Sequence, residues 1–240
     1  MNETLDLINN RKSIRKFNDK KISEKELNHI IKAGLRAPTA GNMMLYSIIK
    51  IKNKSTLKKL SKTCDNQKFI KTADTALIFV ADYRKWKRYF KLNGINVKNQ
   101  SYGNLMLGIN DALIAAQNTV VAAESLGIGS CYIGDIMENY EKQSEILGLP
   151  EGVFLATMLV FGKYDFNPPI TDRFDAKYVV FNEKYRDLDD KEIMSMFAKK
   201  EKNMDSKKYA EKFYNRKINS AFFEEMNRSI ELAIKNWLKN

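Results

Sequence analysis

The sequence predicts a protein of the α+β class with a helical C-terminal extension. Apolar stretches of strand length recur at 45–51, 76–80 and 154–161, and the second is apolar nearly throughout, as expected for a strand buried on both faces. Residues 104–126 carry apolar side chains around most of a helical circumference, which is typical of a helix in a protein core or a dimer interface. Strands and helices together therefore predict a mixed fold.

The C-terminal part differs in composition from the rest. From residue 189 onward, charged helix formers alternate with Met and Phe, and 220–238 has the apolar spacing of an amphipathic helix. A further short strand is expected at 179–181. We predict a main domain over 1–185 and a helical extension over 186–240, too poor in apolar residues to fold alone, which wraps the main body or a partner subunit.

Two helices are predicted near the N-terminus. The first covers 4–10 and should turn Leu5 and Ile8 inward. The second begins at a capping box, in which Ser23 is followed three residues later by Glu26.

The segment between these helices has the composition of a phosphate clamp. Arg11, Ser13 and Arg15 stand at alternate positions, so an extended chain places all three side chains on one face. Guanidinium groups match phosphate oxygens with a planar fork of donors, and Ser adds a short directional donor. Ile14 and Phe17 can anchor the segment against a core. A solvated basic turn is the alternative interpretation of these residues alone.

The net charge of +12 (41 basic residues against 29 acidic ones) indicates an anionic partner. Much of the excess lies in 50–91, where Tyr83, Trp86 and Tyr89 are interleaved with the basic residues. These are the components of a surface for single-stranded nucleic acid. Lysines on the solvated faces of helices give the same composition, and we favour that interpretation.

Several kinds of catalytic apparatus are excluded by composition. One histidine, His29, and two distant cysteines, Cys64 and Cys131, cannot form a usual zinc site or a Ser-His-Asp or Cys-His arrangement. No phosphate-loop motif is present, and no metal site is expected. A bound cofactor must therefore carry any chemistry. The sequence has free cysteines and lacks both a signal-peptide pattern and long apolar runs. These features predict a cytoplasmic protein without membrane association.

The motifs together resemble one family. These are the residues 11–17 (RKSIRKF), Gln67 after a polar turn, residues 122–129 (AAESLGIG) and residues 132–134 (YIG). In this order and spacing the chain resembles the flavin-dependent nitroreductases, and most closely their oxygen-insensitive NADPH nitroreductase and flavin reductase group. The resemblance implies an antiparallel sheet flanked by helices, a homodimer with sites lined by both subunits, and FMN reduced by NADPH or NADH.

The resemblance also implies roles for individual residues. The flavin carries the chemistry, so no catalytic side chain is expected. The FMN-binding residues would be Arg11, Lys12, Ser13, Arg15, Thr39, Gln67, Tyr132, Ile133, Gly134, Asp135 and Arg173. Arg216 would bind the phosphate of NADPH, and Asn42 and Met44 would line the substrate pocket. A backbone N–H in the turn at 132–135, such as that of Gly134, would support charge developing at flavin N5.

This sequence departs from the family pattern at three places. Thr171 and Asp172 replace Lys-Pro before Arg173, which removes a cation and adds an acid beside the expected phosphate. Asp65 and Asn66 replace a Gly-Gly pair before Gln67. A second arginine for the NADPH phosphate is absent near residue 220.

Three functions are compatible with the sequence. The first is an FMN-dependent oxidoreductase that passes electrons by a ping-pong mechanism from NAD(P)H to a small-molecule acceptor, such as a nitroaromatic, a quinone or free flavin. The second is a flavin-binding protein with a storage or sensing role. The third is a nucleic-acid-binding module that uses 50–91. We favour the first, and we expect no nucleic-acid partner.

Overall fold

The computed structural model describes residues 2–202 and 204–239, and the chain forms two compact units. The first unit combines residues 1–168 with 225–240, and the second consists of 169–224. The predicted boundary at residue 185 separates a main domain from an extension that does not fold alone. Compact units do not test whether a part folds by itself, so this boundary stays a prediction.

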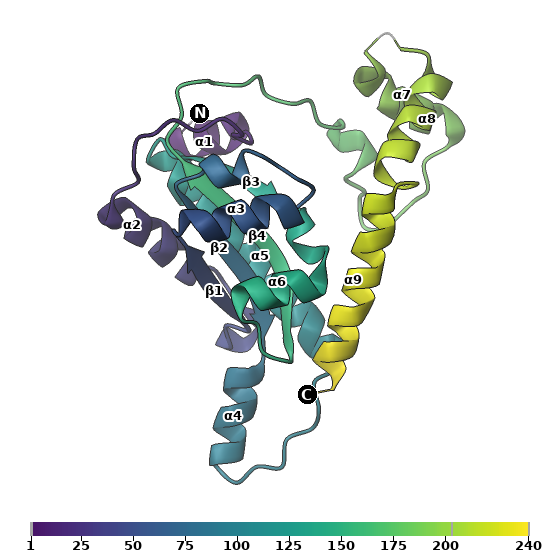
Figure 1. Cartoon of the computed structure of the whole chain (residues 1–240). Helices are drawn as coiled ribbons and strands as arrows, with labels where there is room; N and C mark the ends of the chain where they lie inside the picture. The colour runs from purple at the N-terminus through teal and green to yellow at the C-terminus, as the bar shows by residue number, and fades with distance from the viewer. Residues whose placement is uncertain (1, 203, 240) are drawn as a thin grey trace. The chain divides into compact units, whose positions relative to one another are not determined.

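A four-stranded sheet forms the centre of the first unit, and it is antiparallel, as the family resemblance implied (Figure 1). Its order is β1-β2-β4-β3, with every neighbouring pair antiparallel. The strands are β1 (Tyr46–Ile51), β2 (Thr75–Asp82), β3 (Gly129–Ile133) and β4 (Val153–Gly162). All residues of the two central strands, β2 and β4, are buried, which confirms the burial on both faces predicted for 76–80.

Helices cover both faces of this sheet. Alternate residues of β2 project to opposite sides. Leu77 and Phe79 join one apolar cluster, which is completed by α2 (Glu24–Leu35) and α5 (Tyr102–Ser125). Ile78 joins a second cluster on the other side, with residues of the helices α3 (Lys54–Thr63) and α6 (Tyr140–Leu147). The sheet is thus the middle layer of three.

The N-terminal helices are found as predicted, with one correction. The capping box of α2 is present, because Ser23 Oγ accepts from Glu26 N (3.2 Å) and Glu26 Oε2 accepts from Ser23 N (2.8 Å). In contrast, α1 (Glu3–Asn10) buries no residue. Leu5 and Ile8 are 48% and 49% exposed, so the prediction that they point inward is wrong. The core of the first unit is already closed by α2 and α5, and α1 lies outside it.

The sequence also missed a helix and predicted one strand wrongly. Residues 84–92 form α4, a helix of basic and aromatic residues. Residues 179–181 form no strand. They follow the short turn η4 (Ala176–Tyr178), and Val179 and Val180 are exposed. Apolar β-branched residues favour a strand only where another strand is available to pair with them. The remaining elements are α7 (Asp190–Glu201), α8 (Ser206–Lys217), α9 (Ala221–Leu238) and the short turns η1 (Ala40–Asn42), η2 (Ile70–Thr72) and η3 (Gly134–Met137).

By length and composition alone, α5 could also cross a membrane, with a mean hydropathy of 1.3 over its most apolar window. Of that window, 44% is buried inside the protein. A core helix of a globular protein meets the same criteria, and one helix of this kind is weak support for a membrane span.

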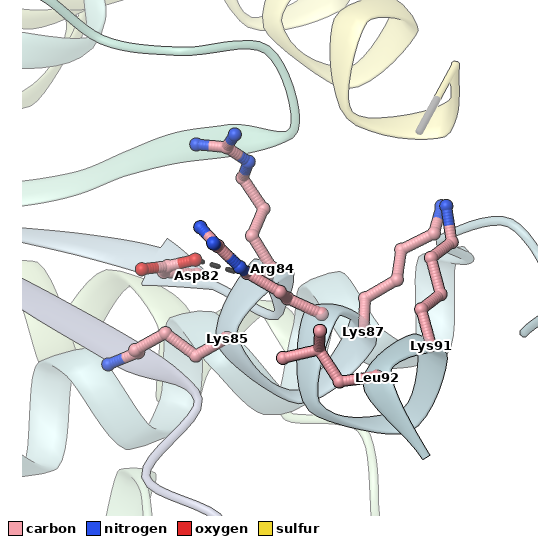
Figure 2. A pocket seen from close by; sticks show the side chains of 7 residues that line it. Asp82, Arg84, Lys85, Lys87, Lys91 and Leu92 are labelled. Carbon is pink, nitrogen blue, oxygen red and sulfur yellow. Dashed lines mark hydrogen bonds between the residues drawn. The ribbon is translucent and has the colours of Figure 1, made fainter. Parts of the chain in front are cut away.

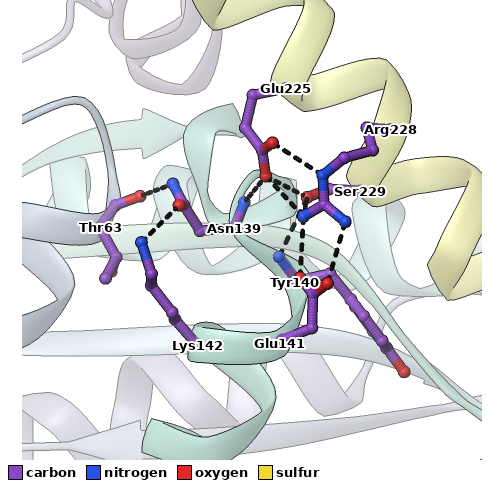
Figure 3. Close-up of polar contacts among 8 residues, drawn as sticks. All are labelled: Thr63, Asn139, Tyr140, Glu141, Lys142, Glu225, Arg228 and Ser229. Carbon is purple, nitrogen blue, oxygen red and sulfur yellow. Dashed lines mark hydrogen bonds and ion pairs between the residues drawn. The ribbon is translucent and has the colours of Figure 1, made fainter.

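The C-terminal part of α9 is anchored to the first unit by a polar network (Figure 3). Arg228 donates to both carboxylate oxygens of Glu141 (2.9 and 2.8 Å) and to Glu225 of its own helix (2.8 Å). Ser229 Oγ accepts from the N–H of Tyr140 at the start of α6 (3.0 Å). Trp237 is fully buried beyond this network. Residues 225–239 are therefore an integral part of the first unit.

Candidate functional site

The predicted clamp lies along the free edge of β3. Ser13 forms an isolated parallel bridge with Ser130, and the N–H of Ile14 donates to the Ser130 carbonyl (2.8 Å). Because β3 pairs with β4 on its other side, this bridge fixes the clamp as a short extension of the sheet.

Two glycines make room for the apolar anchors of the clamp. Gly129 and Gly162 are paired across β3 and β4. A Cβ at Gly129 would lie 2.7 Å from Ile14, and one at Gly162 would lie 2.6 Å from Phe17. Ile14 is buried and Phe17 packs on the core, as predicted. The sequence contains both glycines, but only the pairing of the strands reveals why they are needed.

The polar side chains of the clamp converge on Cys131. Burial raises the pKa of this thiol, whereas nearby Arg15, Ser13 and Arg11 act to lower it. All three predicted ligands therefore lie near this thiol, and their common side of the segment stays a prediction from their alternate positions. In the described part of the chain, neither Arg11 nor Arg15 forms an ion pair with a carboxylate. The guanidinium of Arg15 lies 6.0 Å from the ring centre of Phe69. Their charges remain available to a phosphate, so the clamp fits the expected group.

Two other predicted residues meet beside this clamp. Gln67 Nε2 donates to Asp135 Oδ2 (2.7 Å), which joins the polar turn after α3 to the turn after β3. Tyr132 precedes Asp135 by three residues at the end of β3, and its hydroxyl donates to Gln117 of α5 (3.2 Å). Burial raises the pKa of Tyr132 to about 12, although Arg11 opposes the shift. This tyrosine is therefore neutral at physiological pH.

A buried acid, Glu138, lies near Asp135 of the Gln67–Asp135 pair. Glu138 is 5% exposed, and its Oε1 has no hydrogen-bond partner. Burial, and then the charges of Asp135, Asp65 and Glu225, raise the pKa of Glu138 to about 7, while the N–H of Asp65 stabilises its charged form. The sequence analysis did not identify Glu138, since its environment is formed by three segments distant in sequence.

The loop that carries Thr39, Asn42 and Met44 is tightly constrained. Gly41, Asn42 and Met44 all have positive φ (54°, 56° and 49°), which is unfavourable for the two non-glycine residues. Thr39 Oγ1 accepts from the N–H of Met44 (3.3 Å), so this hydroxyl closes the loop. The conformation requires support from outside the loop.

Asp111 of α5 provides this support. Its Oδ1 accepts from Ala40 N (2.9 Å), and its Oδ2 accepts from Leu45 N (3.1 Å). The carboxylate is 2% exposed and binds both ends of the loop. Trp86 of α4 adds a third attachment through its indole N–H to the Met43 carbonyl (2.6 Å). An acid in the middle of a long apolar helix was the sign in the sequence that could have indicated this role.

Within one chain, this loop and the clamp lie at opposite ends of the sheet. The clamp joins β3 at Ser130, which pairs with Phe161, and Phe161 pairs with Thr75 at the start of β2. The loop leads into β1 where Tyr46 pairs with Ala81, near the end of β2. At about 3.3 Å per residue, these ends of β2 are about 20 Å apart. One chain does not bring Thr39 to the clamp.

Two further predicted residues, Arg173 and Arg216, belong to the second unit. Arg173 is exposed in the loop before η4, and Arg216 of α8 lies over the ring of Phe213 (5.6 Å). Thr171 and Asp172 line a cavity of about 360 Å³ together with Lys199, Lys200 and Lys202, among others. Three lysines therefore line the cavity in which Thr171 stands in place of the family's lysine and Asp172 in place of its proline.

A cationic clamp on the edge strand of an antiparallel sheet, with no ion pair to Arg11 or Arg15 in the described residues, fits a protein that holds an anionic cofactor. Residues 8–163 match the model of the Nitroreductase family, and this chain belongs to that family. The resemblance of its motifs and the fold expected from it are confirmed.

Similar proteins extend this relationship over most of the chain. The NADPH-flavin oxidoreductase of Vibrio harveyi is 32% identical over 195 residues, covering 81% of this chain and 80% of the relative. The oxygen-insensitive NADPH nitroreductase of Salmonella typhimurium is 31% identical over 191 residues, or 80% and 78% of the two chains. The solved structure of the Vibrio harveyi NADPH:FMN oxidoreductase complexed with NAD+ superposes with a TM-score of 0.80 at 27% identity, covering 95% and 98%.

Proposed function

We propose that this protein is an FMN-dependent oxidoreductase that takes hydride from NAD(P)H and reduces small-molecule acceptors such as nitroaromatics, quinones or free flavin. The convergence of Arg11, Ser13 and Arg15 beside the edge of β3 carries the proposal. Membership of the Nitroreductase family and the names of its relatives support it. When bound, FMN supplies the hydride-accepting ring.

The residues of the chain would bind and orient this cofactor. We assign the phosphate and ribityl chain to Arg11, Ser13 and Arg15, with Lys12 beside them. Gln67, whose amide donates to Asp135, would donate or accept at the polar edge of the ring. The turn from Tyr132 to Asp135 would lie along the ring and offer the backbone N–H of Gly134 to N5. Arg173 would add a second contact with the phosphate, and Arg216 one with NADPH.

A homodimer would complete each site. The loop of Thr39, Asn42 and Met44 would come from the partner subunit, because one chain leaves it at the far end of the sheet. On α5, large apolar side chains are exposed in two series seven residues apart, Met106 with Leu113 and Leu107 with Ile114 (39–57% exposed). Such a stripe on a central helix fits a subunit interface. The free, buried cysteines fit the cytoplasmic location that we propose.

The absorbance of purified protein tests this function. We expect a flavin spectrum, or one gained by reconstitution with FMN, which bleaches rapidly on anaerobic addition of NADPH or NADH and recovers when a nitroaromatic or quinone is added. Protein that is colourless and cannot be reconstituted contradicts the proposal. Yellow protein that bleaches very slowly with both donors supports instead a role in flavin storage or sensing.

A further inference from the structure

Glu138 differs from the other buried acids of the chain. In the part of the chain that the structure describes, Asp74, Asp82 and Asp111 are also buried, and each has a partner on both carboxylate oxygens. Figure 2 shows one of these bonds, in which the backbone N–H of Arg84 donates to Asp82 (3.1 Å). Glu138 is 5% exposed, and its Oε1 has no hydrogen-bond partner. A charge on this carboxyl therefore lacks the compensation that the other three acids have.

Three acids face Glu138 from three elements of the fold. Asp135 belongs to the short turn η3, Asp65 follows α3, and Glu225 lies on α9. Burial raises the pKa of Glu138 most, and the charges of these acids add to the shift, which reaches about 7. The N–H of Asp65 opposes the shift, but burial and the like charges outweigh it.

The other ionisable groups around this acid do not offset the three charges. Arg228 binds the carboxylates of Glu225 and Glu141, and Lys142 donates to Asn139 Oδ1 (3.2 Å) (Figure 3). Burial raises the pKa of the Cys64 thiol, with the charges of Asp135 and Glu138 adding to the shift, so this thiol stays neutral. In the described residues, neither Glu138 nor Asp135 forms an ion pair.

Glu138 contacts the turn that carries Gln67. Its carboxylate accepts a hydrogen bond from the N–H of Asp65. Asp65 and Asn66 both have positive φ (50° and 52°), at the two positions where the family pattern has Gly-Gly. Glycine adopts this conformation without strain, whereas residues with a Cβ atom do not. The turn of this chain therefore depends on support from outside.

Residues on either side of Glu138 supply more of this support. Asn139 Nδ2 donates to the carbonyl of Thr63, at the end of α3 (3.1 Å; Figure 3). Asp135 Oδ2 accepts from Gln67 Nε2 (2.7 Å). This segment therefore holds both the backbone of the turn and the side chain that we assign to the flavin.

We propose that Glu138 is a positioning residue for the flavin site, whose neutral carboxyl keeps the turn closed around Gln67 and whose ionisation opens it. A charge on Glu138 adds to those of Asp65 and Asp135, and opening the turn separates these charges and hydrates the carboxylate. The open turn no longer presents Gln67 to the ring. The inference rests on the proposed function, which supplies FMN as the ligand of Gln67.

The affinity for FMN should then fall as the pH rises. In the closed turn the pKa of Glu138 is about 7, whereas a hydrated carboxyl in the open turn returns toward the ordinary value of 4.5. Opening therefore releases a proton between these two values. The open turn gains population as the pH rises toward 7 and changes little above it.

Fluorescence titration of FMN into protein stripped of flavin tests this inference at pH 5.5, 6.5 and 8. The parent is compared with Glu138→Gln at each pH, because the ratio of the two dissociation constants cancels the titration of the FMN phosphate itself. Between pH 5.5 and pH 8 the parent should lose affinity about threefold relative to Glu138→Gln. The control Glu145→Gln removes an exposed acid from α6 and should follow the parent at every pH. Thermal unfolding confirms that each variant is folded.

Asp135→Asn provides a second variant with a different expectation. Its amide oxygen can still accept from Gln67, but the charge beside Glu138 is removed, so the loss of affinity with pH should be smaller than in the parent. Profiles equal to that of the parent in both variants overturn the proposal. A difference between the parent and Glu138→Gln that is constant at every pH also overturns it, because Glu138 would then act by packing alone.

Hydrogen exchange separates this inference from the proposed function. The Gln67 N–H donates to the Cys64 carbonyl (3.2 Å) and loses this bond when the turn opens. In flavin-free protein at pH 8, the Asp65 and Gln67 amides should exchange faster in the parent than in Glu138→Gln, and at pH 5.5 the two proteins should agree. Equal rates at both pH values overturn the proposal. Protein that binds no FMN at any pH contradicts the proposed reductase function, and these exchange rates still decide the role of Glu138.

Discussion

Arg15 is the residue on which the clamp depends most directly. It lies beside Cys131 and Phe69 without an ion pair in the described part of the chain, so its guanidinium can face a phosphate dianion. Arg15→Ala removes charge-assisted hydrogen bonds and should weaken FMN binding by about 1.5–3 kcal/mol. Fluorescence titration of FMN into protein stripped of flavin measures this change.

Lys16→Ala is the matched control for this prediction. Lys16 is also basic and exposed, but the alternation of the extended segment directs it away from the ligand side. Its removal should leave FMN affinity nearly unchanged. If Arg15→Ala binds FMN as tightly as the parent, the assignment of the clamp is wrong.

Glu138 predicts a pH dependence of stability. Its pKa in the folded protein is about 7, raised from 4.5, so the folded state holds a proton that the unfolded state releases between these values. The contribution of Glu138 to the free energy of unfolding is therefore fully present below about pH 4.5 and is lost as the pH rises through 7. Glu138→Gln keeps the acceptor for Asp65 N–H without titrating, and at pH 8 it should be more stable than the parent by up to about 3 kcal/mol.

Urea unfolding of parent and variant from pH 5 to pH 8 gives this difference. The gain should shrink to about 1 kcal/mol at pH 5, where the carboxyl of the folded parent is protonated. The exposed Glu151→Gln should show no such trend. A constant difference across the range would mean that the amide side chain introduced by Glu138→Gln packs differently and that Glu138 does not titrate as inferred.

At the scale of elements, Asp111 joins helix α5 to the loop before β1. Asp111→Ala leaves the N–H groups of Ala40 and Leu45 without acceptors and should destabilise the protein by about 2 kcal/mol or more. Asp111→Asn keeps one acceptor oxygen and should have a smaller effect. Hydrogen exchange at Ala40 and Leu45 should accelerate in both variants.

Asn110→Ala serves as the comparison, because Asn110 is the exposed neighbour of Asp111 on the same helix. It should retain the parent exchange rates in the loop. Slow exchange at both amides in Asp111→Ala would show that other contacts, such as that of Trp86 with Met43, are sufficient to hold the loop.

Signals that are local in the chain were predictable from the sequence. The capping box at Ser23 and the continuous apolar run of β2 each depend on neighbouring residues, and both are confirmed. The antiparallel order of the strands came only through the family resemblance. Helix α4 was missed because its basic and aromatic residues suggested a solvated surface. The opposed glycines, Gly129 and Gly162, acquire meaning only once β3 and β4 are paired.

The same limit applies to the candidate site. The sequence motifs identified the clamp, and the structure brings Arg11, Ser13 and Arg15 together at Cys131. The buried acids that organise the surroundings, Asp111 and Glu138, act on segments far away in sequence. Asp111 stands out in the sequence only as an acid within a long apolar helix, and no local pattern distinguishes Glu138 from a surface carboxylate, because burial is a property of the complete fold.

At the scale of the whole molecule, the separation of the clamp from the Thr39 loop supports the proposal that a second subunit completes each site. In a two-fold dimer each site would combine the clamp of one subunit with the loop of the other. Homodimers of Arg15→Ala and of Asp111→Ala should then each bind FMN weakly, because both of their sites are damaged.

A mixed dimer of these two variants should recover one normal site. The Asp111→Ala subunit contributes an intact clamp, and the Arg15→Ala subunit contributes an intact loop, whereas the second site carries both defects. Co-expression with two different affinity tags allows the mixed dimer to be isolated, and we expect about half the parent FMN content per dimer, bound with parent affinity. If each site belonged to a single chain, both sites of the mixed dimer would remain damaged and no tight binding would return. The measurement therefore separates a shared site from two independent ones, whatever acceptor the protein reduces.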